Sequence, residues 1–241
     1  MLFFYVRHGD PIYETDSLTP LGRRQAEAVA KRLSLHGLDK IYASTMRRAN
    51  LTAEPTCEIL KLDKTQVDFA NEQKAWDLLS LDWEDGNRSW VFHEPKSRKM
   101  LHDPSVRALG SKWYTHPAFV EHTDFQKGIE RVSTGTDDFF LQLGYKHIPG
   151  TGTYRAVAPT DERVALFAHQ GVGLILLSHL LDIPFPLFAT NFDMGHTGMT
   201  VIEFKQEPGS DLVIPCVLTL GSDGHLYREG LPTKYQNVLY F

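Results

Sequence analysis

The sequence of 241 residues contains little cysteine and little net charge. Its two cysteines, Cys57 and Cys216, can form at most one disulfide bond and lack the spacing of metal ligands, which excludes a disulfide-stapled or zinc-finger fold. The 25 Lys and Arg residues against 30 Asp and Glu residues give a net charge of −5. That charge argues against a protein that binds nucleic acid through its overall charge. We therefore expect no nucleic-acid partner.

Long hydrophobic runs are also missing from the sequence. The first apolar run, Leu2 to Val6, stops at Arg7 and lacks the basic leader of a secretory signal. The longest later run, 171–181, is interrupted by Ser178 and His179, so nothing in it is typical of a membrane span. We expect a cytoplasmic protein without a membrane partner.

What is present is an ordinary globular composition, with 42% hydrophobic and 23% charged residues. Short apolar runs at 2–6 and 163–168 are typical of buried strands. Between them, Thr19 and Pro20 predict the start of a helix that ends before Gly37. The residues after it predict a second strand at 38–43.

A second helix is predicted over 45–60, where Pro55 is expected to end or kink it. The apolar run 171–181 indicates a helix buried against a sheet, and 199–204 and 212–220 are the last strand candidates. This alternation predicts one α/β domain over residues 1–241, with a mostly parallel central sheet and helices on both faces.

The middle of the chain, 87–152, lacks that alternation and is rich in aromatic residues and histidine. One helix is expected near 129–143. Because long connections inside compact domains are usually functional caps or lids, we interpret 87–152 as an inserted, mainly helical and irregular cap.

Polar residues that could take part in catalysis or ligand binding follow the predicted strands. Arg7, His8 and Gly9 come after the first strand, an arginine pair opens the second helix, and His169 follows the strand at 163–168. Ligands of open α/β sheets bind outside the carboxyl ends of the strands. Two histidines, two arginines and a carboxylate from the acidic segment 77–86 suit a pocket for phosphate transfer.

These segments, in this order, resemble the histidine phosphatase superfamily, which includes cofactor-dependent phosphoglycerate mutases and many phosphomonoester phosphatases. The matching stretches are 4–9, 18–22, 42–53, 77–86, 164–171 and 200–204. They cover both flanks of the chain and skip its middle. In the phosphatase branch, the resemblance implies a metal-independent phosphohydrolase of the histidine acid phosphatase type. Such an enzyme acts on small-molecule phosphate esters without a cofactor.

The resemblance also implies roles for individual residues. His8 becomes the nucleophile that accepts the phosphoryl group, flanked by Arg7, and Arg48 becomes the second phosphate-binding arginine. His169 would bind phosphate and stabilise the transition state. Arg47 points about 100° away from Arg48 on a helix and is expected to be solvated.

The proton donor is assigned to Asp77, because the family carries a Glu or Asp in this region. Glu84 and Asp82 are alternatives. A donor of this kind protonates the leaving alkoxide and can then activate the water that hydrolyses phosphohistidine.

Two departures from the family pattern add further candidates. Gln170 stands where the family usually has glycine, and it can still offer a backbone N–H to phosphate. His196 stands where the family usually has Asn, and either phosphate or substrate contact or a structural role is open to it. His36 and His179 are interpreted as structural, and the histidines of the middle segment as surface or cap residues without metal-ligand spacing.

Three rival functions remain beside a phosphatase. A phosphoglycerate mutase is disfavoured because the Glu-Arg and Gly-rich extension after the acidic region is missing. A catalytically inactive protein that binds phosphorylated ligands is disfavoured because all five core positions carry competent residues. A metallohydrolase is disfavoured because no carboxylate and histidine cluster at ligand spacing appears. The sequence does not identify the substrate, and it is compatible with an oligomer.

Overall fold

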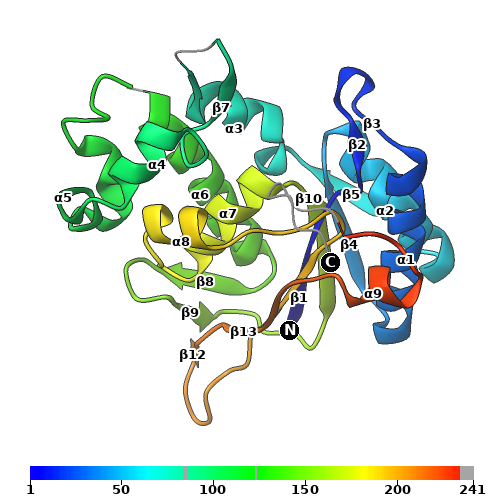
Figure 1. The fold of residues 1–241 in the computed structure, drawn as a ribbon. Helices are drawn as coiled ribbons and strands as arrows, with labels where there is room; N and C mark the ends of the chain where they lie inside the picture. The colour runs from blue at the N-terminus through cyan, green and yellow to red at the C-terminus, as the bar shows by residue number, and fades with distance from the viewer. Residues whose placement is uncertain (84–85, 123, 234–241) are drawn as a thin grey trace.

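A six-stranded sheet forms the centre of the fold (Figure 1). The computed structural model describes residues 1–83, 86–122 and 124–233. The strand order is β13-β11-β1-β10-β4-β5. Neighbours from β1 to β5 are parallel, and β11 is antiparallel to both β1 and β13. The predicted mostly parallel α/β sheet is confirmed. Its strands are β1 (Leu2–Arg7), β4 (Lys40–Ser44), β5 (Lys64–Val67), β10 (Arg163–Ala168), β11 (Met199–Glu203) and β13 (Cys216–Ser222).

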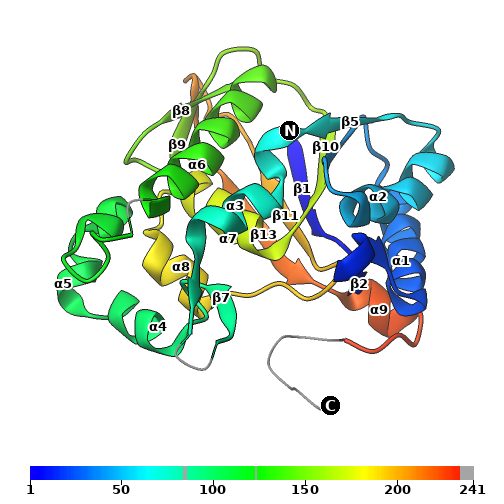
Figure 2. The ribbon, with the colours of Figure 1, turned by 90° about the horizontal axis from the view of Figure 1, so that it is seen from above.

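Helices cover both faces of this sheet (Figure 2). Successive side chains of a strand point to opposite faces. In β1, Phe4 and Val6 are therefore buried in one core cluster with Val29 of α1, whereas Phe3 and Tyr5 belong to a second cluster on the other face. The helices that carry these clusters are α1 (Pro20–His36) and α2 (Arg47–Leu60) on the first face, and α3 (Glu72–Leu79), α6 (Asp124–Gln142) and α7 (Gln170–Leu180) on the second.

Shorter elements connect these layers. Three small sheets pair β2 with β3, β6 with β7, and β9 with both β8 and β12. Their strands are β2 (Pro11–Ile12), β3 (Ser17–Leu18), β6 (Ser80–Asp82), β7 (Arg88–Trp90), β8 (Tyr145–Ile148), β9 (Thr153–Ala156) and β12 (Leu212–Val213). The remaining helices are α4 (Pro95–Leu101), α5 (Pro104–Arg107), α8 (Phe185–Asn191) and α9 (Gly224–Arg228), with 3₁₀ turns at Tyr13–Thr15, Asp68–Ala70 and Gly110–Thr115.

The boundaries of α1 follow its capping residues. The Thr19 side chain accepts a hydrogen bond from the Gly22 N–H, Pro20 is the first helical residue, and Gly37 closes the helix at φ 71°. The helix α2, in contrast, does not end at Pro55 but continues to Leu60. The strand predicted at 212–220 divides into β12 and β13, which belong to different sheets.

The middle segment contains two kinds of structure. Although it was predicted as part of a cap, α6 packs on the central sheet, where Phe140 lies 5.0 Å from Phe3 and 4.9 Å from Phe204 between ring centroids. The short helices before it surround Trp113, which stacks on Phe185 of α8 at 5.6 Å. The cap boundaries at 87 and 152 stay a prediction. The short helices that do not pack on the central sheet come before α6 in the chain.

The sequence left the pairing of the cysteines open and predicted no membrane span. Both Cys57 and Cys216 are free thiols. Among the helices that the structure describes, none has the length and apolar character needed to cross a bilayer.

The turn after β1 is locked against the start of α1. A Cβ atom on Gly22 would lie 2.2 Å from the carbonyl oxygen of Asp10, and one on Gly9 would lie 2.6 Å from the carbonyl oxygen of Gly22. The Asp10 N–H donates to Gln25 Oε1 at 2.8 Å, and the Asp10 carbonyl accepts from the Thr19 N–H at 2.9 Å. Since backbone touches backbone here, the position of the residues after β1 depends on both glycines.

We expect Gly22→Ala to lower the free energy of unfolding by about 1–3 kcal/mol, because the added methyl group has no room. Urea unfolding followed by circular dichroism measures this. The control is Gly224→Ala, since a Cβ at Gly224 meets nothing within 4 Å. Equal stability of the two variants would show that the turn is not rigidly packed.

Candidate active site

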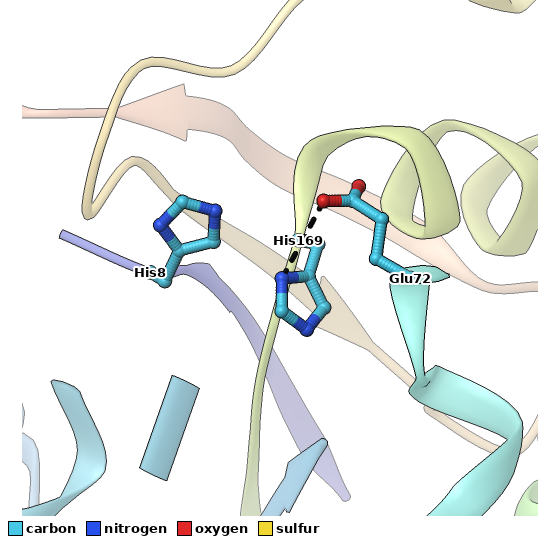
Figure 3. A group of neighbouring side chains, drawn as sticks. All are labelled: His8, Glu72 and His169. Atoms are coloured by element: carbon cyan, nitrogen blue, oxygen red, sulfur yellow. Dashed lines mark ion pairs between the residues drawn. The ribbon is translucent and has the colours of Figure 1, made fainter. Parts of the chain in front are cut away.

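Two buried histidines meet at the carboxyl ends of β1 and β10 (Figure 3). His8 follows β1 and His169 follows β10, and these strands are parallel neighbours with Arg7 paired to Ala168. The His8 N–H donates to the Ala168 carbonyl at 2.9 Å, and the two imidazole centroids are 5.2 Å apart. The strand pairing therefore sets the distance between the two rings.

His8 is held in one tautomer. Its Nδ1 lies 2.7 Å from the Gly9 carbonyl oxygen, and because a carbonyl only accepts, Nδ1 carries the proton and Nε2 carries the lone pair. Burial lowers the pKa of His8 well below its usual value, and the nearby His169, Arg48 and Arg7 lower it further. His8 is thus a neutral imidazole with a lone pair on Nε2 at pH 7.

His169 is fixed through both its backbone and its ring. The Tyr5 hydroxyl donates to the His169 carbonyl at 2.6 Å, and His169 Nε2 lies 2.8 Å from Ser44 Oγ. Burial, followed by the charges of Arg48 and Arg7, lowers the pKa of His169 well below its usual value. The ring is therefore neutral and rigidly oriented beside His8.

Arg48 is a buried cation at the start of α2. Its Nη1 donates to Asp16 Oδ1 at 2.7 Å and its Nη2 to Glu72 Oε2 at 3.0 Å. The neighbouring Arg47 is exposed, in agreement with the expectation that it is solvated. Among the described residues, the Nε atoms of Arg48 and Arg7 have no hydrogen-bond partner.

Arg7 and His196 form the opposite wall. One Nη atom of Arg7 donates to the Met194 carbonyl, and the other lies 3.3 Å from His196 Nε2. The His196 ring lies 5.7 Å from that of His8, and its Nδ1 lies 3.4 Å from Asp10 Oδ1. His196 thus borders the nucleophile candidate while its ring also links Arg7 to Asp10.

Gln170 is the first residue of α7, directly after His169. Its side-chain Nε2 donates to Asp193 Oδ1. Because this side chain is hydrogen-bonded to the loop before β11, the group of Gln170 nearest to His169 is its backbone N–H, at the start of the helix.

The carboxylate at this site is Glu72, which the sequence analysis missed. Glu72 opens α3 behind the capping residue Asn71, and its Oε2 lies 3.6 Å from His169 Nδ1. Figure 3 shows the carboxylate directed at the His169 ring. Its other oxygen accepts from the Gly171 N–H at 2.8 Å. An N-cap followed by an acidic first-turn residue was the local signal for this helix start.

Asp77, predicted as the proton donor, is not at the site. It is exposed and accepts a hydrogen bond from Gln73 Nε2 at 2.8 Å. Five positions on a helix correspond to a rotation of about 140°, so Glu72 and Asp77 point in different directions from α3. The role of Asp77 stays a prediction that its exposed position does not support, because the helix that approaches the histidines does so with its first turn, which carries Glu72.

The sequence left two alternative donors, Asp82 and Glu84. Asp82 is exposed and pairs with Arg88 at 3.7 Å. Glu84 lies outside the described residues, so its role stays a prediction.

A cleft of about 590 Å³ opens beside Arg48 and Glu72. Two of its aromatic residues, Trp76 and Trp90, pack edge to face with ring centroids 5.1 Å apart. Burial lowers the pKa of His93 at this cleft to about 4, which makes it a neutral group at pH 7. The cleft is lined by Tyr13, Asp16, Met46, Arg48, Glu72, Gln73, Trp76, Arg88, Ser89, Trp90 and His93.

A carboxylate and histidine cluster therefore exists, contrary to the prediction from sequence spacing. The ligand atoms of His8, Glu72 and His169 lie within 4.8 Å of one another. The residues are far apart in the chain, which is why their spacing did not reveal them. The charges of Arg7 and Arg48 lower the pKa values of both histidines, and the same positive field opposes a cation and favours an anion.

Residues 3–100 match the family model described as histidine phosphatase superfamily (branch 1). The resemblance to the histidine phosphatase superfamily is confirmed. The matched residues include His8, Arg48 and Glu72, and His169 is contributed by the part of the chain beyond them.

Solved structures of phosphatases share the fold along most of this chain. A phosphoserine phosphatase from Entamoeba histolytica, in complex with 3-phosphoglyceric acid, has a TM-score of 0.59 at 19% identity and covers 93% of this chain and 98% of its own. A mycobacterial glucosyl-3-phosphoglycerate phosphatase has a TM-score of 0.56 at 16% identity, covering 92% of this chain and 98% of its own. At these identities the likeness concerns the fold.

Curated relatives match a shorter stretch. Serine/threonine-protein phosphatase Pgam5, mitochondrial, of Drosophila ananassae and of Drosophila yakuba is 44% identical over 69 residues. The match covers 26% of this chain and 24% of each relative. The chain thus spans about a quarter of the length of these curated relatives.

Because His8 and His169 are buried as neutral imidazoles, we expect the free energy of unfolding to fall as the pH is lowered. An unfolded histidine has a pKa of about 6.5, whereas the folded pKa values of both residues are lowered. Below pH ~6.5 the unfolded state binds more protons, so stability is complete above this pH and declines as the pH falls. Each buried histidine contributes a slope of up to about 1 kcal/mol per pH unit.

Urea unfolding between pH 5 and 7.5 measures this slope. His93 and His225, with pKa values lowered to about 4, act in the same sense. We therefore compare slopes between variants: His8→Asn and His169→Asn should each flatten the decline, and His102→Ala, at an exposed position, should not. An unchanged slope in both buried variants would mean that neither histidine is held neutral.

Proposed function

We propose that this protein is a phosphatase that hydrolyses small-molecule phosphomonoesters through a phosphohistidine on His8. The observation that carries the proposal is the neutral imidazole of His8, whose Nε2 lone pair stands in the field of two buried guanidinium groups. A neutral imidazole is a nucleophile, and guanidinium groups match the oxygens of a phosphate.

In the first step, His8 Nε2 attacks phosphorus and the bond between phosphorus and the ester oxygen breaks. Arg7, Arg48 and His169 surround the phosphoryl group and offset the charge on its oxygens, which is the main demand of phosphoryl transfer. Arg48 exchanges part of its contact with Asp16 and Glu72 for the incoming anion. No metal ion takes part in this step.

Glu72 supplies the proton for the leaving alkoxide. Its carboxylate is in reach of Arg48 and His169 and borders the cleft, where the alcohol portion of the ester would lie. The negative charge of a bound phosphate favours proton uptake by a neighbouring carboxyl group. After donating, the carboxylate takes a proton from the water that attacks phosphohistidine, which releases inorganic phosphate and restores His8.

The shape of the cleft supports a small substrate with an apolar or ring portion. Its volume of about 590 Å³ is typical of small-molecule sites, and Trp76, Trp90 and Tyr13 offer aromatic surface. Arg88 adds a cation at the same cleft, suited to a second anionic group on the substrate. The similar solved structures include phosphatases of phosphoserine and of glucosyl-3-phosphoglycerate, which combine a phosphate ester with a carboxylate.

Substitution of the nucleophile tests the proposal. We expect His8→Ala and His8→Asn to abolish phosphate release from a panel of phosphomonoesters, and wild-type protein quenched during turnover to carry an acid-labile phosphoryl label. Activity should survive a metal chelator. Substantial turnover by both variants would exclude a phosphohistidine on His8, and loss of activity in the chelator without any loss of folding would indicate a metal-dependent hydrolase. Incubation with 3-phosphoglycerate separates the rivals: isomer formation indicates a mutase, and binding without any product indicates an inactive ligand-binding protein.

The proton donor is tested by a matched pair of substitutions on α3. Glu72→Gln should lower kcat by about 10²–10⁴-fold, because removal of a general acid costs this much, while Asp77→Asn should leave kcat unchanged. Substrates with better leaving groups, such as aryl phosphates, should lose less in Glu72→Gln than alkyl phosphates do. An effect of Asp77→Asn larger than that of Glu72→Gln would return the role to Asp77.

A further inference from the structure

A second group of histidines and carboxylates lies where α6, β8 and α7 meet. Asp137 comes from α6, His147 from β8 and His179 from the last turn of α7, and their ligand atoms lie within 4.8 Å of one another. His179 is separated from His169 by the length of α7, roughly 15 Å. The group is therefore distinct from the candidate active site.

The interpretation of these histidines from the sequence alone was incomplete. His147 is not a surface residue, since its side chain is only 2% exposed. The three residues are brought together by packing of α6 and α7 on the second face of the sheet, which no spacing along the chain reveals.

One carboxylate oxygen joins the two imidazole rings. Asp137 Oδ1 lies 2.9 Å from His147 Nδ1 and 2.8 Å from His179 Nε2. The two rings lie edge to face at 4.8 Å. Three potential ligand atoms, two nitrogens and one oxygen, thus lie within 4.8 Å of one another.

The remaining nitrogen of His147 faces another carboxylate. Its Nε2 lies 3.1 Å from Asp182 Oδ2, which also accepts from the Gly152 N–H at 2.7 Å. Histidine ligands of metals usually donate their second N–H to a carboxylate, which fixes the tautomer and the ring orientation. Here Asp182 directs the Nδ1 atom of His147 at Asp137 and His179, and stacking on Tyr154 at 4.8 Å holds the ring plane.

The local charge favours a cation, in contrast to the active site. Two carboxylates, Asp137 and Asp182, contact the His147 ring at 2.9 and 3.1 Å, and Asp137 also contacts His179 at 2.8 Å. Carboxylate groups this close together attract a positive ion.

A cavity lies beside one member of the cluster. Its volume is about 140 Å³, and it borders His179 and Asp182, with Ser133 and Ser178 in its wall. Zn²⁺ binds His and Asp ligands at about 2.0–2.2 Å in tetrahedral geometry and commonly completes its shell with water. Ligand atoms now 2.8–2.9 Å apart would separate to roughly 3.3 Å around such an ion.

We propose that Asp137, His147 and His179 bind one divalent transition-metal ion of the Zn²⁺ type, with Asp182 as the positioning residue behind His147. Metal binding requires the histidine nitrogens that face Asp137 to carry no proton. A neutral ring meets this requirement by moving its proton to its other nitrogen, and a protonated ring by releasing one proton to solvent. The ion would hold α6, β8 and α7 together, and it would thereby stabilise the packing of α6 and α7 on the second face of the sheet. This site is independent of the phosphatase proposal, because it shares no residue with it.

Zinc binding to metal-free, tag-free protein tests the proposal. We expect titration calorimetry, or competition with a chromophoric chelator, to give one Zn²⁺ per chain together with a rise in Tm. Co²⁺ in its place should show the intense visible bands of tetrahedral coordination. Affinity should fall by about 10–100-fold in Asp182→Asn and further in Asp137→Asn and His179→Ala.

Two control variants separate this site from the other histidines. His8→Ala removes a ligand from the cluster at the candidate active site, and His102→Ala removes an exposed histidine; both should bind one Zn²⁺ with wild-type affinity. Far-UV circular dichroism checks that every variant is folded. The proposal is overturned if wild-type protein binds no Zn²⁺, if Asp137→Asn and His179→Ala bind it as tightly as wild type, or if His8→Ala abolishes binding.

Discussion

The parallel pairing of β1 with β10 is the constraint on which the candidate active site depends. It sets Arg7 against Ala168 in register, so that the next residue of each strand is a histidine. The His8 N–H donates to the Ala168 carbonyl, and Tyr5 of β1 holds the backbone of His169 from the same strand pair. Because both strands are buried on both faces, a shift of one residue would move apolar side chains into the wrong layer. The core that stabilises the sheet therefore also fixes the distance between the two imidazoles.

Electrostatics then determine what this arrangement can bind. Burial keeps His8 and His169 neutral, and Arg7 and Arg48 supply the positive charge beside them, with Asp16 and Glu72 paired to Arg48. Guanidinium groups match the geometry of the oxygens of a phosphate. The site thus combines an uncharged nucleophile with nearby guanidinium charges. In an unstructured chain, water would screen those charges.

Sequence signals from neighbouring residues predicted the features that depend only on residues close together in the chain. The strand ends placed Arg7, His8 and His169, and the capping residues placed α1. Glu72 was missed because its role depends on the approach of α3 to the start of α7, a contact between segments nearly one hundred residues apart in the chain. The choice of Asp77 followed a motif in the right region of the sequence, but Asp77 points in a different direction from α3 than Glu72 does. The hairpin of β8 and β9 was missed for a similar reason, as it is a small sheet outside the main one with no repeat of the βα pattern.

The two histidine clusters show how the same side chains acquire opposite preferences. Each contains two imidazoles and a carboxylate within 4.8 Å, and α7 connects them, with His169 before its first turn and His179 in its last. At the first, guanidinium groups dominate, the imidazoles are neutral and the field favours an anion. At the second, Asp137 and Asp182 both contact His147, and the proposed ligand is a cation. In the two proposals, ligand preference follows the charges that surround each cluster and not the histidines themselves. The helix α7 is buried nearly all round, and its rigid packing fixes the distance between the two clusters.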